Sequence, residues 1–375
     1  MFAVGKVMQE KLIIAYGDGG NGKSTLFNAI TNAGAQAANY PFCTIEPNVG
    51  VVSVPDSRVD WLAQLYHPRK AVHATVEFVD IAGLVRGASH GEGLGNRFLS
   101  HIREVDAIVH VVRCFEDGNV VHVDGAVNPV RDMETVTLEL ILADMEAVQK
   151  RGEKARKMFK TGEKKYELEA EAADKLLSTL ESELPARLCP LSPEQREIAD
   201  GWFLLTDKPV IYAANIAEND ITTPPEQLPL VSAVLDKAGA EQAGTIVISA
   251  QIEQEIASLP QEEKQLFLDE MGIRRSGLDN LIQAGYRLLG LISFLTVGDD
   301  ECRAWTIRMG TRAPQAAGKI HTDFERGFIR AEVVPFETLK GHGTMAQCRE
   351  KGLVRSEGKD YVMQDGDVTL FRFNV

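Results

Sequence analysis

The chain has 375 residues, of which 44% are apolar and 25% charged, and its net charge is −14. This length suits two or three domains, and the composition is that of an ordinary globular protein. The five cysteines are scattered without a Cys-x-x-Cys pair, which argues against a disulfide framework or a zinc site. No segment approaches the roughly 20 apolar residues that span a bilayer, so we expect a cytoplasmic protein without membrane contact.

Short β-rich runs alternate with helical or glycine-rich segments in the first third of the chain. We expect strands at 12–16, 50–54, 75–79 and 107–112, and two more of the same kind at 210–214 and 245–249. Strands connected in this way form a mostly parallel sheet covered by helices. The sequence therefore predicts an α/β fold.

The pattern changes after residue 132. Residues 133–160 are rich in helix formers, and a second helical pattern over 166–184 has apolar residues at spacings of three and four. Gly162 marks a bend between them, so we expect an inserted antiparallel helical hairpin. From residue 285 onward strand-like runs return, as at 305–309, 327–334 and 368–373. The predicted domains are 1–132 with 205–284, the inserted arm 133–204, and a small C-terminal domain 285–375.

The segment from Gly17 to Ser24 satisfies the phosphate-loop pattern G-x-x-x-x-G-K-[ST], and it lies between a predicted strand and a predicted helix. Backbone amides of such a loop point at phosphate oxygens, and the lysine neutralises the β and γ phosphates. The hydroxyl of Ser24 is then a magnesium ligand. The residues that we expect to bind the nucleotide here are Gly17, Asp18, Gly19, Gly20, Asn21, Gly22, Lys23, Ser24 and Thr25.

A second motif follows the strand at 75–79. Asp80-Ile-Ala-Gly83 has the form of a Walker B aspartate followed by a D-x-x-G glycine. We expect Asp80 to hold Mg²⁺ and the Gly83 amide to sense the γ-phosphate. The glycine-rich residues 83–96 that follow suit a switch segment that the γ-phosphate orders.

Several longer motifs make the chain resemble the YchF or Obg-like ATPase family. They are Asn39-Tyr-Pro-Phe-Cys-Thr-Ile-Glu-Pro-Asn48, Phe78-Val-Asp-Ile-Ala-Gly-Leu-Val85, Gly91-Glu-Gly-Leu-Gly-Asn96, His110-Val-Val-Arg-Cys-Phe115, Arg303-Ala-Trp305, His321-Thr-Asp-Phe324 and Phe371-Arg-Phe-Asn-Val375. The resemblance covers nearly the whole chain. It implies a Ras-like nucleotide domain, an inserted coiled-coil arm and a C-terminal TGS domain of β-grasp type.

The same resemblance implies roles for two further residues. Thr44 is expected to be the switch I ligand of Mg²⁺, so that the predicted metal ligands are Ser24, Thr44 and Asp80, and the predicted catalytic residues are Lys23, Thr44 and Gly83. In hydrolytic relatives a glutamine follows the D-x-x-G glycine, whereas this chain has Leu84. A leucine side chain cannot orient the attacking water, so we expect slow intrinsic turnover.

The motif that reads the base favours adenine. Guanine sites of regulatory GTPases use N-K-x-D, but this chain has Asn215-Ile216-Ala-Glu218 after the strand at 210–214. The lysine is replaced by an apolar residue, and the longer Glu218 changes the geometry of the guanine contact. Similar motifs in the family accompany ATP use, and Ser249-Ala250 is expected to flank the base. We expect ATP as the substrate, with GTP hydrolysed less well.

The phosphate loop departs from the family pattern G-x-P-N-V-G-K-S at one position. Gly20 stands where the family has asparagine, and Asn21 follows it. In related K⁺-activated NTPases that asparagine helps to hold a monovalent cation near the phosphates. We therefore expect slow turnover that is nearly indifferent to K⁺.

Positive charge is concentrated in the predicted arm. Eight basic residues and two acidic ones lie between 150 and 165, a local charge of +6: Lys150, Arg151, Lys154, Arg156, Lys157, Lys160, Lys164 and Lys165 against Glu153 and Glu163. A charged stretch is often only a solvated helix face, but a basic projecting arm also suits RNA phosphates.

The predicted protein is a monomeric, ribosome-associated ATPase switch that contacts the ribosome or its RNA through the arm and the TGS domain. Three alternatives remain at this stage: a GTP-preferring GTPase, a metabolic kinase, and a nucleotide-binding regulatory module with negligible turnover.

Overall fold

The computed structural model describes residues 11–15, 22–37, 49–80, 94–117, 126–159 and 163–374. The chain forms two compact units. The larger unit comprises Lys11–Gly50 and Phe78–Leu281, and within the described chain the smaller unit comprises Val51–Glu77 and the residues from Ile282 onward. The chain passes from one unit to the other within two strands and one helix.

The larger unit is built on a sheet in the order β2-β4-β1-β5-β6-β7. Pairing is parallel from β1 through β5 and β6 to β7. Every residue of β5 and β6 is buried, as expected for parallel strands covered on both faces. The strands are β1 (Lys11–Ala15), β2 (Val49–Ser53), β4 (Thr75–Asp80), β5 (Ala107–Arg113), β6 (Val210–Asn215) and β7 (Gly244–Ile248). All six predicted strands are therefore confirmed to within one residue at each end.

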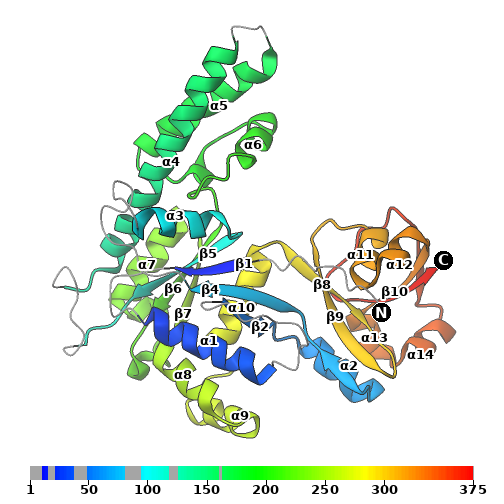
Figure 1. The fold of residues 1–375 in the computed structure, drawn as a ribbon. Helices are drawn as coiled ribbons and strands as arrows, with labels where there is room; N and C mark the ends of the chain where they lie inside the picture. The colour runs from blue at the N-terminus through cyan, green and yellow to red at the C-terminus, as the bar shows by residue number, and fades with distance from the viewer. Residues whose placement is uncertain are drawn as a thin grey trace. The chain divides into compact units, whose positions relative to one another are not determined.

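Helices cover both faces of this sheet (Figure 1). Helices α1 (Lys23–Ala37) and α8 (Ala250–Ser258) pack against one another. A separate core joins β5 and β6 to α3 (Leu94–Arg103), α4 (Pro129–Phe159) and α7 (Pro229–Ala240). The remaining elements of this part are η2 (Glu218–Asp220), η3 (Pro225–Gln227), α9 (Gln261–Glu270) and the start of α10 (Gly277–Leu288).

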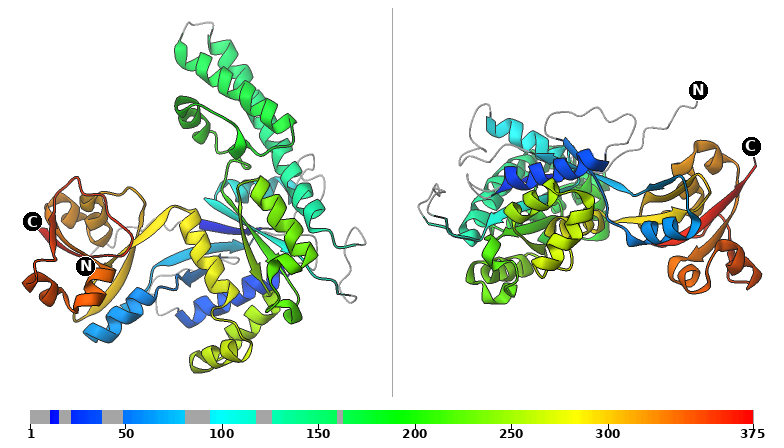
Figure 2. Two further views of the ribbon diagram at one scale, coloured as in Figure 1. Left: turned by 180° about the vertical axis from the view of Figure 1, so that it is seen from behind. Right: turned by 90° about the horizontal axis from the view of Figure 1, so that it is seen from below.

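The predicted helical arm is formed by α4 and α5 (Lys164–Glu181), which run side by side in Figures 1 and 2. Small residues allow their close approach, since a Cβ atom on Gly152 would lie 2.9 Å from the Cβ of Ala173. The chain returns through η1 (Ala186–Leu188) and α6 (Pro193–Asp200), which begins with a capping box between Ser192 and Gln195. The bend at Gly162 lies outside the described residues.

A buried carboxylate joins α4 to the segment that leads back into the sheet. Asp144 is 2% exposed and accepts hydrogen bonds from the backbone nitrogens of Leu205 (2.8 Å) and Thr206 (2.7 Å). The hydroxyl of Thr206 donates a third bond, also at 2.7 Å. Burial raises the pKa of Asp144, although these hydrogen bonds act in the opposite direction. The carboxylate therefore ties the root of the arm to the chain entering β6.

The smaller unit has a second sheet in the order β11-β10-β12-β8-β9-β3. Its strands are β3 (Lys70–Val72), β8 (Leu291–Thr296), β9 (Glu301–Arg308), β10 (Phe328–Pro335), β11 (Arg355–Glu357) and β12 (Asp367–Phe373). The antiparallel pair β8 and β9, with β12 parallel to β8, forms the mixed sheet expected of a β-grasp fold. The helices are α2 (Ser57–Tyr66), α11 (Ala313–Ile320), α12 (Thr322–Arg326), α13 (Phe336–His342) and α14 (Met345–Glu350).

Helix α11 packs its alanines onto a core that includes Phe294 and Phe371, whose rings meet edge to face at 5.6 Å. On α2, Trp61 meets Phe336 in the same geometry at 5.5 Å. One ionic contact also binds α2 to the C-terminal part, because Arg58, which pairs locally with the N-cap residue Asp56, also pairs with Asp365. Residues 51–77 therefore belong structurally with the C-terminal part, which no sequence pattern indicated. The strands β3, β8 and β11 were likewise not foreseen.

Replacing Asp144 by alanine should destabilise the protein, because three donors would lose their buried acceptor. We expect a loss of about 2 to 4 kcal/mol in the free energy of unfolding. Urea unfolding followed by circular dichroism measures this change. Asp200→Ala, at an exposed position on α6, serves as control and should change stability by less than about 0.5 kcal/mol. Equal stability of the two variants would contradict the role given to Asp144.

Candidate active site

The described end of the phosphate loop is Gly22, directly before α1. Its φ is +83°, in the left-handed region that favours glycine, and its carbonyl accepts the first helical bond from the Leu26 nitrogen at 2.8 Å. Lys23 is then the first residue of α1, and Ser24 follows with an exposed side chain. The predicted strand-loop-helix context of this motif is therefore present.

Lys23 meets the acidic residue at the end of the neighbouring strand. Its Nζ lies 2.9 Å from Oδ1 of Asp80, and the two side chains are 10% and 21% exposed. The last residue of β4 and the first of α1 thus face each other at the carboxyl end of the sheet, where ligands bind in α/β folds. This contact brings the two predicted phosphate and metal motifs to one place.

The oxygen donors at this point suit magnesium. The carboxylate of Asp80 and the exposed hydroxyl of Ser24 are hard ligands, and Mg²⁺ is typically bound through one or two such groups together with phosphates and water. Within the described ranges, no cluster of three His, Cys, Asp or Glu side chains could hold a metal alone. A magnesium ion here would therefore depend on the nucleotide for the rest of its shell.

The predicted base-reading motif lies at the end of β6. Asn215 is 3% exposed, and its Oδ1 accepts a hydrogen bond of 2.8 Å from the backbone nitrogen of Ala250. The next residue, Ile216, donates its backbone N–H to the carbonyl of Ile248 at 2.9 Å. The last residue of β6 and the residue after it are therefore tied to the segment 248–250, which joins β7 to α8.

Asn215 also reaches the phosphate loop. A Cβ atom built on Gly22 would lie 2.3 Å from Nδ2 of Asn215 and 3.1 Å from Cβ of Ala250. Only a residue without a side chain permits so close an approach. The phosphate loop, β6 and α8 thus meet at a three-way junction, which consists of Gly22, Asn215 and Ala250.

The other predicted base-side residues differ in exposure. Ser249 is 1% exposed and precedes α8, and its hydroxyl has no hydrogen-bond partner within the described chain. Ile216 is buried, whereas Glu218 is exposed in η2. Thr25 is partly exposed on α1. Several predicted residues lie outside the described part: Gly17, Asp18, Gly19, Gly20, Asn21, Thr44 and Gly83.

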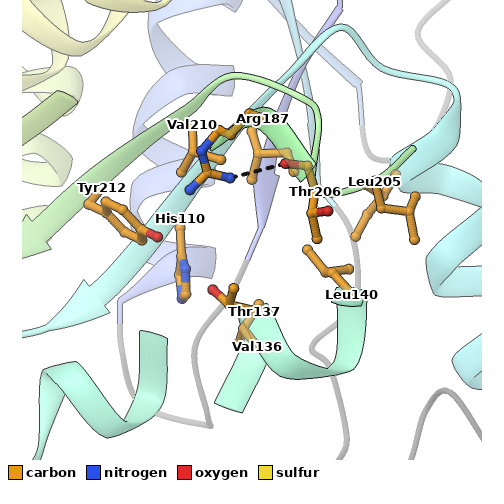
Figure 3. A pocket seen from close by; sticks show the side chains of 11 residues that line it. His110, Val136, Thr137, Leu140, Arg187, Leu205, Thr206, Val210 and Tyr212 are labelled. Carbon is orange, nitrogen blue, oxygen red and sulfur yellow. Dashed lines mark hydrogen bonds between the residues drawn. The ribbon is translucent and has the colours of Figure 1, made fainter. Parts of the chain in front are cut away.

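A small hollow in the larger unit lies at the root of the arm (Figure 3). Its volume of about 20 Å³ exceeds the roughly 10 to 15 Å³ that a water molecule needs. His110 of β5 and Tyr212 of β6 line it, with ring centres 5.4 Å apart. Burial lowers the pKa of His110 to about 3, so the imidazole is neutral at physiological pH.

Arg187, which also lines this hollow, forms an ion pair beside it. Arg187 of η1 lies 2.6 Å from Oε2 of Glu241, which also accepts the hydroxyl of Tyr212 at 2.8 Å. Figure 3 shows Arg187 donating to the carbonyl oxygen of Thr206. Sequence analysis did not find these residues, because a single arginine after Pro185 carries no motif. They anchor the arm and form a site distinct from the phosphate loop.

A parallel sheet with a phosphate-loop lysine paired to a strand-end aspartate, and an asparagine packed on the loop, defines the class of P-loop NTPases. Residues 13–143 match the family model "50S ribosome-binding GTPase". Residues 291–374 match the YchF-GTPase C-terminal model, described as "Protein of unknown function (DUF933)".

Relatives of high sequence identity show which family of this class the chain belongs to. The chain is 55% identical over 354 residues to "Ribosome-binding ATPase YchF" of Bacillus subtilis, covering 94% of this chain and 96% of the relative. It is 46% identical to "Obg-like ATPase 1" of Oryza sativa subsp. japonica, with 94% and 90% covered. A solved YchF GTPase of Schizosaccharomyces pombe matches with a TM-score of 0.86 and 38% identity over 97% of each chain. The chain belongs to the YchF family, and the predicted fold class and nucleotide hydrolase activity are confirmed.

Replacing Lys23 or Asp80 by alanine should abolish nucleotide hydrolysis. Each variant loses a charge that we expect to meet the phosphates or the metal, and removal of one such stabilising group typically costs about 100-fold or more in rate. Phosphate release measures the loss, and circular dichroism should show an unchanged fold. Asp236→Ala, at an exposed position on α7, should retain full activity. Hydrolysis at the unmodified rate by Lys23→Ala would show that the site lies elsewhere.

Proposed function

We propose that the protein is a magnesium-dependent ATPase whose nucleotide state controls its attachment to ribosomes. The observation that carries this proposal is the junction of Gly22, Asn215 and Ala250 beside the Lys23–Asp80 pair. This junction supports the proposal because Gly22 of the predicted phosphate motif lies next to Asn215 of the predicted base motif, as one bound nucleotide requires. Hydrolysis transfers the γ-phosphoryl group to water, and the β–γ bridging oxygen leaves with the nucleoside diphosphate.

In this proposal the chain acts mainly through charge and position. Lys23 turns from Asp80 to the β and γ phosphates and neutralises the negative charge that develops on them. Asp80 and Ser24, with Thr44, would hold Mg²⁺, and the ion would supply positive charge against the phosphates. The amides from Gly17 to Gly22 hold the phosphates, and the Gly83 amide senses the terminal one.

The side chains around the base support ATP over GTP. Ile216 is buried and apolar where a guanine site has lysine, and Glu218 is exposed where such a site has aspartate. Ser249 offers a buried hydroxyl beside Ala250. The names of two relatives, from Bacillus subtilis and rice, describe ATPases, whereas the fission yeast relative of known structure is named a GTPase. An ATPase with residual GTP hydrolysis is compatible with both kinds of name.

The names of relatives and the positive charge of the arm support the ribosome as a partner. The Bacillus subtilis and Escherichia coli O157:H7 relatives are both called ribosome-binding. Three of the basic residues on the arm are engaged within the protein: Lys150 with Glu146, Arg156 with Asp174, and Arg151 over the ring of Trp202.

Four other arm lysines are exposed and form no salt bridge within the described residues: Lys154, Lys157, Lys164 and Lys165. Exposed Met158 and Phe159 lie among them. Phosphate-binding lysines next to apolar side chains suit a ribosomal RNA surface. We propose that this part of the arm makes the contact, with the C-terminal TGS domain as second site, from a monomer in the cytoplasm. None of the helices within the described ranges is long and apolar enough to cross a bilayer.

Nucleotide preference is tested by titrating the protein with ATP and GTP. We expect ATP to bind at least as tightly as GTP, because a lost base contact costs about 1 to 3 kcal/mol, or roughly tenfold or more in affinity. Glu218→Asp restores the aspartate of the guanine motif, and its combination with Ile216→Lys restores the whole motif. Both variants should raise the affinity for GTP. A clear preference of the unmodified protein for GTP would favour the GTPase alternative.

The arm is tested by changing Lys154, Lys157 and Lys164 together to glutamate. Ribosome binding should weaken and its dependence on salt should flatten, since phosphate contacts release counterions. Co-sedimentation with ribosomes at several salt concentrations measures both, and ATP hydrolysis without ribosomes should hardly change. The matched control replaces the same lysines by arginine, which keeps the charge and should keep binding. Unaltered co-sedimentation of the glutamate variant at low salt would contradict the proposed contact and favour the interpretation that these lysines form only a solvated helix face.

A further inference from the structure

A buried glutamate lies directly behind the base-side junction. Glu253 is in the first turn of α8, is 2% exposed, and donates its backbone N–H to the carbonyl of Ser249 at 3.0 Å. Its Oε1 accepts a hydrogen bond of 2.7 Å from the backbone nitrogen of Gly277, the first residue of α10. One side chain therefore connects the beginnings of two helices.

The start of α10 is pressed against the strand that leads into the junction. A Cβ atom on Gly277 would lie 2.9 Å from Cγ1 of Ile248 and 3.1 Å from Oε1 of Glu253. Ile248 is the last residue of β7, and its carbonyl accepts the N–H of Ile216. Movement of Gly277 would therefore displace the end of β7 and, with it, the loop at Ser249.

We infer that Glu253 is a positioning residue, which with Gly277 holds Ser249 and Ala250 in place against Asn215 and so sets the affinity for the base half of the nucleotide. The inference rests on the proposed nucleotide site. It goes beyond that site because Glu253 does not need to touch the ligand. The hydrogen bond between Ala250 and Asn215 requires the first turn of α8 to stay fixed, and the Glu253 carboxylate is what fixes it to α10.

The carboxylate also has a distinctive titration. Burial raises the pKa of Glu253 to about 7, although hydrogen bonds from Ser276, Gly277 and Leu278 act in the opposite direction. The charged groups that face it across a hollow of about 240 Å³ are Asp279 of α10 and Lys264 of α9. Because the folded pKa is raised, the stability linked to this group is present below pH 4.5 and is lost as the pH rises through about 7.

Calorimetric titration of the full chain with Mg-ATP and with Mg-tripolyphosphate, which lacks the base, tests the inference. Glu253→Ala should lower the affinity for ATP about tenfold, the amount expected when one hydrogen-bonded contact is lost, and leave that for tripolyphosphate nearly unchanged. Glu253→Gln keeps an acceptor at the same place and should recover most of the loss. Gly277→Ala disturbs the contact from the other side and should reproduce the selective loss without altering the carboxylate.

Glu255→Gln, at an exposed position on the same helix, is the control and should bind both ligands normally. Thermal unfolding compares the melting temperatures of the unmodified protein and Glu253→Gln. The advantage of the unmodified protein should decrease as the pH rises from 5 to 8, a range that spans a folded pKa of about 7. Equal losses for ATP and tripolyphosphate, or no loss in any variant, would overturn the inference and leave the proposed ATPase intact. Failure of the unmodified protein to bind ATP would overturn both.

Discussion

The site depends on one side chain, that of Asn215. Its carboxamide accepts the backbone N–H of Ala250 and at the same time packs on Gly22, where no Cβ atom would fit. A buried amide has few alternative partners, and an unsatisfied one costs about 1 to 3 kcal/mol. The end of the phosphate loop at Gly22, the end of β6 and the start of α8 are therefore held in one arrangement beside the proposed nucleotide site.

The strand that carries Asn215 also reaches the arm. Alternate residues of a strand face opposite sides of the sheet, and Tyr212 lies on the side of α4 and α7. Its hydroxyl donates to Glu241, which is paired with Arg187 at the root of the arm. β6 is thus in contact with the proposed nucleotide site at its end and with the root of the arm near its middle. A nucleotide-dependent shift of this strand would be felt by both.

The sequence predicted the fold well, and it offered the proposed nucleotide motifs, because each has a strong local pattern. A phosphate loop needs glycine and lysine at fixed spacing, and buried parallel strands are continuous apolar runs, as at 107–112 and 210–214. It did not predict the contacts that join segments distant in the chain. Glu253 and Gly277, or Arg187 and Glu241, are ordinary residues in sequence, and only the packing of helices brings them together. The assignment of residues 51–77 to the smaller unit has the same origin, since the pairing of β3 with β9 leaves no local signal.

The arm root is held by charged groups where apolar packing would be simpler. Asp144 and the Arg187–Glu241 pair are largely removed from water, and a buried ion pair often adds little net stability compared with well-packed apolar residues. Their hydrogen bonds are directional, however, whereas apolar contacts allow a long helix to slide or rotate at small cost. A helix of 31 residues extends about 46 Å, so a small rotation at its root moves its far end by many ångströms. We interpret the buried charges as the means by which the orientation of the arm is kept specific, which the proposed contact between the arm lysines and the ribosome would require.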